Sequence, residues 1–217
     1  MIDTIIDMHN TSRYGLTLFI LLLCAGNVVA VFWYQDIQYR MPTPYPKGLV
    51  QPALYSEIYL PPTVRHRMFE GEETILHFFD PECPCSRFTI QHLDALQKNY
   101  GKYVRFIAVA QSPHGGDMAD TLYTTGKYSM PIVVDSAGQI AAALGVYATP
   151  QAVILNKQGM LYFRGNYNTS RYCTNRATEF VRLALDSLLA QKPSPQFAHP
   201  TSVVVAYGCA IPFHNRP

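Results

Sequence analysis

The stretch Asp80-Pro81-Glu82-Cys83-Pro84-Cys85-Ser86-Arg87 brings two cysteines to the junction of a predicted strand and a predicted helix. Before it, the apolar, aromatic and β-branched residues 74–79 (Thr-Ile-Leu-His-Phe-Phe) predict a buried strand. After it, leucines recur at helical spacing as far as Tyr100, and Gly101 follows as a stop. A helix is therefore predicted from Pro84 to about Tyr100, with proline in its favoured place in the first turn.

Cysteines at the start of a helix are predisposed to react. The unpaired backbone N–H groups and the positive end of the helix dipole stabilise a thiolate there, and the thiolate is the nucleophilic form of cysteine. Cys83 and Cys85 are therefore the candidate catalytic residues, with Cys83 predicted to attack and Cys85 to resolve. Two plainer interpretations stay open, namely that the pair serves a structural disulfide or a metal clip.

Length, charge and cysteine content narrow the function classes. A chain of 217 residues holds one ordinary domain with additional segments. A net charge of +2 and the lack of a long basic run argue against a nucleic-acid partner. Five cysteines are too few for a disulfide scaffold.

The N-terminal region predicts a membrane anchor. Residues 14–34 contain no charged side chain, whereas a membrane span needs about 20 mostly apolar residues. Aromatic residues stand at both ends of this segment, as expected at membrane interfaces. A cleaved signal peptide is the alternative, but the apolar run is longer than a signal core of roughly 7–15 residues. The predicted organisation is a tail at 1–13, an anchor at 14–34 and a Pro-rich, extended linker at 35–63.

The rest of the chain alternates strands and helices. Further strands are predicted at 103–110, 131–135 and 146–155, the last with Pro150 near its start. A hairpin turn at 156–159 leads into another predicted strand at 160–165. Helices are predicted at 139–144 and 174–189, with a loop and short helix within 111–127. This order predicts an α/β domain over 64–190 with a central mixed sheet, followed by a tail at 191–217 that packs on the domain.

Two segments resemble a known family. Phe78-Phe79 followed by a cysteine pair at a helix start resembles the active-site entry of thioredoxin-like proteins. The stretch 144–159 (Leu-Gly-Val-Tyr-Ala-Thr-Pro-Gln-Ala-Val-Ile-Leu-Asn-Lys-Gln-Gly) resembles their cis-proline loop and the hairpin after it. The chain is most similar to the membrane-anchored TlpA, ResA and cytochrome-maturation branch, over about Val64 to Leu189. It departs from that branch in having Cys83-Pro84-Cys85-Ser86 in place of Cys-x-x-Cys. If Cys83 matches the first cysteine, which its distance from Phe78-Phe79 favours, Ser86 stands where the second is usual; if Cys85 matches the second, Glu82 stands in place of the first.

The resemblance implies a thioredoxin-like fold and a site. Thr149 and Pro150 would form a cis X-Pro loop beside the cysteines, where the backbone of Thr149 pairs with an extended substrate strand. The implied partners are exported cysteine-containing proteins and a membrane redox protein. The implied location is the inner membrane of a bacterium, as a single-pass protein with its C-terminal domain in the periplasm.

Cys209 ends a run at 203–209 (Val-Val-Val-Ala-Tyr-Gly-Cys) that predicts a strand in the tail. Cys173 and Cys209 are predicted to form a structural disulfide that pins the tail to the domain. The alternative is that one of them resolves a mixed disulfide at Cys83. Both readings favour an oxidising compartment, which places the domain outside the cytoplasm.

His77 has two interpretations. It fills a core position of its strand, or it joins Cys83 and Cys85 in a soft copper site, because thiolate and imidazole ligands suit copper. The prediction is therefore a membrane-tethered thiol–disulfide oxidoreductase without a cofactor. The alternative is an extracytoplasmic copper-binding carrier that uses the same cysteines, and a third hypothesis is a peroxidase acting through Cys83.

Overall fold

The structure is a computed structural model, and it describes residues 2–35, 41–60, 62–65, 71–111, 129–170 and 172–211. The chain divides into two compact units, residues 1–41 and 42–217, and each is described by itself. Most of the predicted loop and short helix within 111–127 lies outside the described residues.

The larger unit is built on a five-stranded mixed sheet with the order β3-β2-β1-β5-β6. β1 (Thr74–Phe79) runs parallel to β2 (Arg105–Ala110), and β2 runs parallel to β3 (Ile132–Val134). On its other side β1 pairs antiparallel with β5 (Gln151–Leu155), which forms a hairpin with β6 (Leu161–Gly165). The parallel pairs require crossover connections, and a helix supplies the crossover between β1 and β2.

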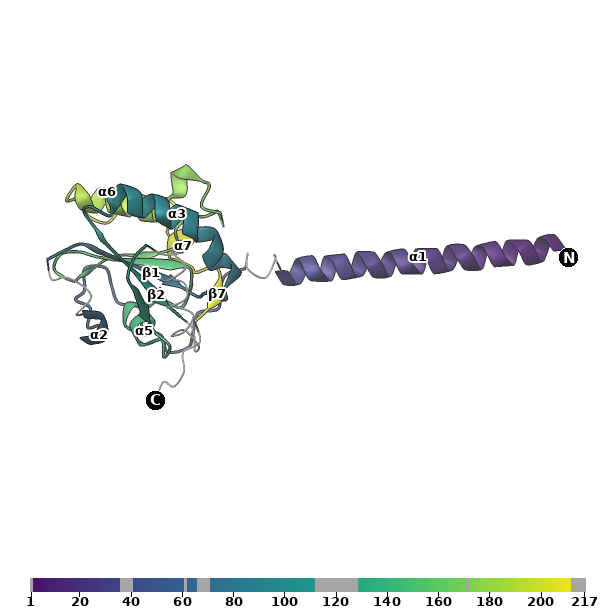
Figure 1. The fold of residues 1–217 in the computed structure, drawn as a ribbon, viewed down its shortest axis with the longest axis horizontal. Coiled ribbons are helices and arrows are strands. Elements are labelled where there is room, and N and C mark those ends of the chain that lie inside the picture. Colours follow the sequence, from purple (N-terminus) through teal and green to yellow (C-terminus); the bar gives the residue numbers. More distant parts are fainter. Residues whose placement is uncertain are drawn as a thin grey trace. The chain divides into compact units, whose positions relative to one another are not determined.

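β1 is the centre of the domain, because all of its side chains are buried. Ile75 and Phe79 point into a core shared with α3 (Pro84–Tyr100) and α6 (Phe180–Leu189), whereas Leu76 and Phe78 join a core with α5 (Gln139–Leu144). Alternate residues of a strand face opposite sides of its sheet, so a strand covered on both faces is apolar throughout. Figure 1 shows α3 and α6 together on one face of the sheet and α5 on the other.

This three-layer arrangement is the thioredoxin-like fold that was predicted, with its mixed sheet flanked by helices. β1 and α3 have the predicted bounds. The predicted last helix is divided into a short 3-10 turn (Arg176–Thr178) and α6, because Glu179 between them departs from helical geometry.

The tail differs more from expectation. The strand-like run that was predicted at 203–209 begins in a short helix, α7 (Pro200–Val204), and only β7 (Cys209–Ala210) is extended. Proline occupies the first turn of α7, and Val203 is buried against Gly165. Tertiary packing of this valine therefore overrides the strand preference of a β-branched residue.

The proline-rich segment after residue 41 packs on the domain instead of forming a spacer. Leu49 is buried with Tyr147 and Ala206, and the Gln51 side chain donates a 2.7 Å hydrogen bond to the carbonyl oxygen of Gly145. Glu57 forms an isolated bridge with the hairpin, and a short helix, α2 (Pro62–Arg65), follows. The domain therefore begins earlier than the predicted residue 64.

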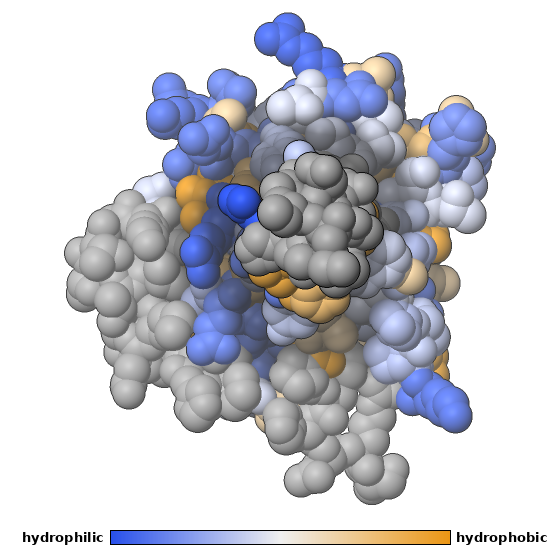
Figure 2. Space-filling view, turned by 90° about the vertical axis from the view of Figure 1, so that its right-hand side faces the viewer, coloured by the Kyte–Doolittle hydropathy of each residue, from blue (hydrophilic) through white to orange (hydrophobic). Residues whose placement is uncertain are grey.

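The smaller unit is dominated by α1 (Ile2–Gln35). Among the described residues, Arg13–Gln35 is the helical segment that is long and apolar enough to cross a membrane, a criterion that a signal sequence also meets. None of its most apolar window is buried in the rest of the chain. Its large hydrophobic side chains are exposed. Figure 2 shows hydrophilic side chains projecting around the visible outline of the molecule, with hydrophobic areas between them. A single-pass membrane protein is the organisation that this helix suggests.

Asp135 ties the end of β3 to α5. Its buried carboxylate accepts hydrogen bonds from the backbone N–H groups of Ile140 (3.1 Å) and Ala141 (2.9 Å) and from the side chain of Gln111 (2.9 Å). We expect Asp135→Ala to lower the free energy of unfolding by about 2–3 kcal/mol, because buried donors lose a charged acceptor. Urea denaturation of the full chain in detergent measures this change. Ser136→Ala, at the exposed neighbouring position, is the control, and an equal effect of the two variants would contradict the assignment.

Candidate active site

Cys83 lies between the central strand β1 and the helix α3. A turn separates them, in which the N–H of Glu82 donates to the side chain of Asp80 (2.8 Å) and the N–H of Cys83 donates to the carbonyl of Asp80 (3.1 Å). Cys83 is the N-cap residue of α3, with extended backbone angles, and Pro84 occupies the first turn. Its side chain makes no capping hydrogen bond. The sulfur is thus placed at the positive end of the helix dipole, where a thiolate is stabilised.

Cys83 forms a disulfide with Cys209, a residue 126 positions further along the chain, and the two Cα atoms lie 6.0 Å apart. The predicted pairing of Cys173 with Cys209 is therefore wrong. The bond agrees with the alternative that one of these two cysteines resolves a mixed disulfide at Cys83, and the resolving role itself stays a prediction. Cys173 lies elsewhere, half-buried against the main core. Burial, and next the charge of Glu179, raise the pKa of its thiol to about 12.

Backbone pairing brings Cys209 to this position. β7 lies antiparallel to β4 (Ala148–Thr149), with Cys209 opposite Thr149 and Ala210 opposite Ala148. The N–H of Ile211 extends the pairing by donating to the carbonyl of Tyr147 (2.9 Å).

Thr43, in the segment just after residue 41, makes two further hydrogen bonds to the tail. The N–H of Thr43 donates to the carbonyl of Ala206 (2.8 Å), and its hydroxyl donates to the carbonyl of Gly208 (3.0 Å). The tail is therefore held at residues 209–211 by β4 and Tyr147 and at residues 206 and 208 by Thr43.

Thr149 and Pro150 lie beside the disulfide, where the resemblance implies a substrate-binding loop. The peptide bond between them is cis, and the carbonyl oxygen of Thr149 lies 3.8 Å from the Cys83 sulfur. Only 1% of Thr149 and 2% of Cys83 is exposed, so the tail closes the site in this state. The substrate-binding role of Thr149 and Pro150 stays a prediction.

The predicted second cysteine has a different place. Cys85 is buried in the first turn of α3 and lies outside the disulfide. Ser86, which stands where the resembling family has its second cysteine, is also buried, and its hydroxyl accepts the N–H of Asp80 (3.2 Å). Ser86 therefore holds the turn that presents Cys83, and the partner of Cys83 comes from the tail.

Asp80 belongs to the same turn. Burial raises the pKa of its carboxyl group, although the N–H of Glu82 acts in the opposite direction. Its hydrogen bonds assign it a structural role in the loop. Glu82 is exposed.

His77 occupies a fully buried position within β1. Its ring stacks on Phe79, and its Nδ1 atom lies 2.8 Å from the hydroxyl of Tyr167. Among the residues that the structure describes, no group of three histidine, cysteine or acidic side chains is placed to hold a metal. The set of His77, Cys83 and Cys85 is thus not assembled while Cys83 is bonded to Cys209, and the copper alternative stays a prediction.

The burial of His77 predicts a pH dependence of stability. Burial lowers the pKa of its imidazole from 6.5 to about 3. Between these values the unfolded chain binds a proton that the folded chain does not, so stability falls as the pH falls, by about 1.4 kcal/mol per pH unit from this group. We expect His77→Phe to remove this contribution. Urea denaturation between pH 7 and about pH 4 measures it, and a stability difference between wild type and variant that does not change with pH would contradict it.

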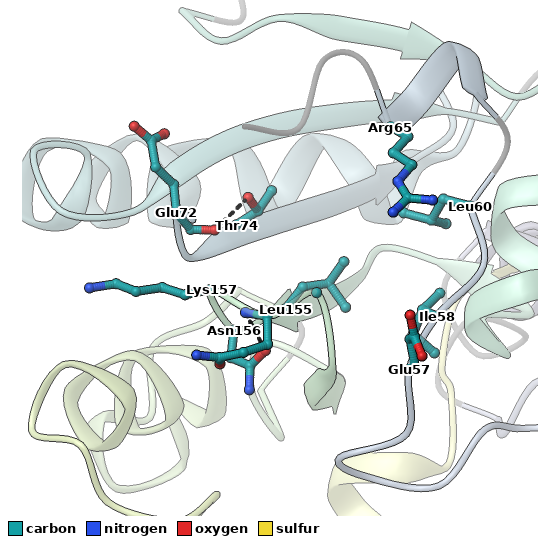
Figure 3. A pocket seen from close by; sticks show the side chains of 11 residues that line it. Glu57, Ile58, Leu60, Arg65, Glu72, Thr74, Leu155, Asn156 and Lys157 are labelled. Carbon is teal, nitrogen blue, oxygen red and sulfur yellow. Dashed lines mark hydrogen bonds between the residues drawn. The ribbon is translucent and has the colours of Figure 1, made fainter. Parts of the chain in front are cut away.

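A separate hollow of about 260 Å³ opens at the start of β1, which is the end opposite to Cys83. Figure 3 shows Arg65, Leu60 and Ile58 along one part of its wall, with Glu72 and Lys157 at another. Acidic and basic side chains both line it, and no described cysteine does. It is thus distinct from the disulfide site.

The mixed sheet, the cysteine at the start of α3 and the cis-proline loop beside it define a thioredoxin-like protein with a disulfide at its active-site position. The sequence profile of the family described as "Domain of unknown function (DUF6436)" matches residues 58–210. This match spans more than half of the chain, and the protein belongs to that family.

Several known proteins are similar to this chain. The sporulation thiol-disulfide oxidoreductase A of Bacillus subtilis (strain 168) is 26% identical over 93 residues, which cover 42% of this chain and 56% of that protein. The chain thus matches about half the length of this curated relative. Among solved structures, an uncharacterized conserved protein from Geobacillus kaustophilus superposes with a TM-score of 0.61 at 22% identity, covering 82% of this chain and 99% of that one.

A hypothetical protein from Sinorhizobium meliloti 1021 gives a TM-score of 0.57 at 17% identity, covering 76% of this chain and 95% of that one. At these identities the two solved structures are similar in fold.

Proposed function

We propose that this protein is a membrane-tethered thiol–disulfide oxidoreductase in which Cys83 is the reacting cysteine and Cys209 resolves it. The observation that carries the proposal is the Cys83–Cys209 disulfide at the start of α3, next to Thr149 and Pro150. The helix terminus lowers the free energy of the Cys83 thiolate, which makes this residue both a nucleophile and a good leaving group. The name of the Bacillus subtilis relative supports the same class of reaction.

The exchange proceeds in two balanced steps. In the reduced protein, the Cys83 thiolate attacks one sulfur of a substrate disulfide, which forms a mixed disulfide and releases the other substrate sulfur as a thiolate. The Cys209 thiolate then attacks the Cys83 sulfur, forms the intramolecular disulfide and releases the second substrate thiolate. The substrate gains two electrons and the protein loses two; the reverse sequence oxidises a substrate dithiol.

The proposed setting is the periplasmic side of a bacterial inner membrane, with α1 as the anchor. Disulfides form and persist in oxidising compartments such as the periplasm. The proposed substrates are cysteines of exported proteins, and a membrane redox protein would restore the working redox state.

The test measures reduction of a peptide disulfide by the full chain in detergent, with dithiothreitol as the source of electrons. We expect Cys83→Ser to abolish the protein-dependent rate, because Cys83 is the N-cap residue of α3 and its sulfur lies beside the carbonyl oxygen of Thr149. Cys173→Ser is the matched control and should keep the wild-type rate, since its thiol lies outside the site. A Cys83→Ser variant that retains the rate would refute the proposal.

A further inference from the structure

Residues 206–211 of the tail, which include β7, lie beside Cys83 and pair with β4 in the place proposed for a substrate. We infer that residues 206–211 are an internal occupant of the substrate-binding edge that the resemblance assigns to Thr149, and that this edge accepts peptides with glycine immediately before the reacting cysteine. This inference rests on the proposed function, since it names the substrate class of the same site.

The first support is how the tail is held at β4. Its contacts there are backbone pairs in antiparallel register, together with the disulfide at the position opposite Thr149. Main-chain pairing at a strand edge is independent of most side chains, so an extended segment of another protein can take the place of the tail. A foreign cysteine placed opposite Thr149 would meet the Cys83 sulfur in the same way as Cys209 does.

The second support is Gly208. Its φ angle of +137° is one that residues with a side chain rarely adopt. A Cβ atom built at this position collides with the carbonyl oxygen of Thr149. The backbone before the reacting cysteine therefore approaches β4 too closely for any side chain, which makes this position of the peptide selective.

The tail can leave the site without leaving the domain. Upstream of β7, the side-chain amide of Asn166 donates to the carbonyls of Ser202 (3.0 Å) and Val205 (2.6 Å). The N–H of Ala206 donates to the hydroxyl of Tyr147 (2.9 Å). These contacts keep Cys209 near Cys83 after reduction, so its return both resolves the mixed disulfide and displaces the substrate strand.

When a substrate dithiol replaces β7 on β4, the thiol–disulfide exchange needs no reactant other than the dithiol and the Cys83–Cys209 disulfide. A thiolate of a substrate dithiol attacks the Cys83 sulfur and expels the Cys209 thiolate, and the substrate strand takes the place of β7 on β4. The second substrate thiolate then attacks its own partner sulfur and expels the Cys83 thiolate. The substrate is oxidised by two electrons, and the Cys83–Cys209 disulfide is reduced to two thiols.

The test uses peptides that copy the tail. The peptide Val-Ala-Tyr-Gly-Cys-Ala-Ile carries thionitrobenzoate on its cysteine, and the matched peptide has alanine in place of glycine. Each is mixed with the reduced full-chain Cys209→Ser variant, and the coloured thionitrobenzoate that Cys83 expels is followed; the Cys83→Ser/Cys209→Ser double variant is the blank. We expect the glycine peptide to react at least about tenfold faster, a difference of about 1.4 kcal/mol in the barrier.

The outcomes separate the two proposals. Equal rates for the two peptides, or reaction of Cys83 with dithiobis(nitrobenzoate) but with neither peptide, would overturn the inference and leave the oxidoreductase proposal standing. Failure of Cys83 to react with either peptide and with dithiobis(nitrobenzoate) would overturn the oxidoreductase proposal itself.

A second measurement uses the tail in place. Gly208→Ala should shift the equilibrium between the Cys83–Cys209 disulfide and glutathione at least about tenfold toward the dithiol, because β7 no longer fits against β4. Gly159→Ala is the matched control, since Gly159 also has a positive φ (+74°), but a Cβ atom added there meets no other atom within 4 Å. An equal shift in both variants would overturn the inference.

Discussion

Replacing Cys209 by serine is expected to lower the turnover of a peptide disulfide roughly 100-fold and to trap a mixed disulfide between substrate and Cys83, because an external thiol replaces an intramolecular one. Cys209 is the only described residue that forms a disulfide with Cys83, and β7 holds it opposite Thr149. Turnover is measured with the full chain in detergent at low external thiol. The trapped species is measured by mass spectrometry without reductant.

Cys85→Ser is the control that discriminates between the two candidate resolving residues. If Cys209 resolves, this variant keeps most of the turnover, apart from the cost of altering a buried position. The reverse pattern, with full activity in Cys209→Ser and trapping in Cys85→Ser, would restore Cys83–Cys85 as the working pair.

Reduction of the Cys83–Cys209 disulfide is expected to lower the free energy of unfolding by as much as about 5 kcal/mol. The bond joins residues 126 positions apart, so it removes a large loop entropy from the unfolded chain. The measurement compares urea denaturation of the full chain in detergent with and without dithiothreitol.

The controls for this effect are two cysteine variants. Cys209→Ser should lose the dependence on reductant, and Cys173→Ser should keep it, because the Cys173 thiol is not part of the bond. A wild-type protein that unfolds at the same urea concentration in both conditions would show that the bond does not constrain the chain.

Features set by nearby residues were predicted from the sequence. The apolar run of β1, Pro84 at the start of α3 and the stretch around Pro150 each carry a local signal, and the structure places Cys83, Thr149 and Pro150 together. The fold class follows from the same local patterns, since alternating strands and helices leave few ways to cover a mixed sheet.

The partner of Cys83 was not predicted as the leading pair, because it depends on contacts between distant segments. Cys173 and Cys209 are closer in sequence, but only the pairing of β7 with β4 decides where Cys209 lies. One local signal did point to it. Gly208 interrupts a strand-like run just before Cys209, and a glycine in a strand often marks a close approach of another backbone.

The packing of residues 42–60 was missed for a similar reason. Repeated prolines indicate an extended segment, but they do not reveal what the segment lies against. Leu49 is buried beside Ala206, and Thr43 bonds to the tail strand, so this segment helps to hold Cys209 in place.

A thiol-labelling mass map of the full chain in detergent, titrated across glutathione redox buffers without metal, tests the central claim most directly. The claim predicts one reversible bond between Cys83 and Cys209, with Cys85 and Cys173 remaining thiols at every potential. A reversible Cys83–Cys85 bond, or a Cys173–Cys209 bond that stays closed, would contradict it. If the cysteines never pair but become protected from labelling when copper is added, the result would favour the copper-binding carrier instead.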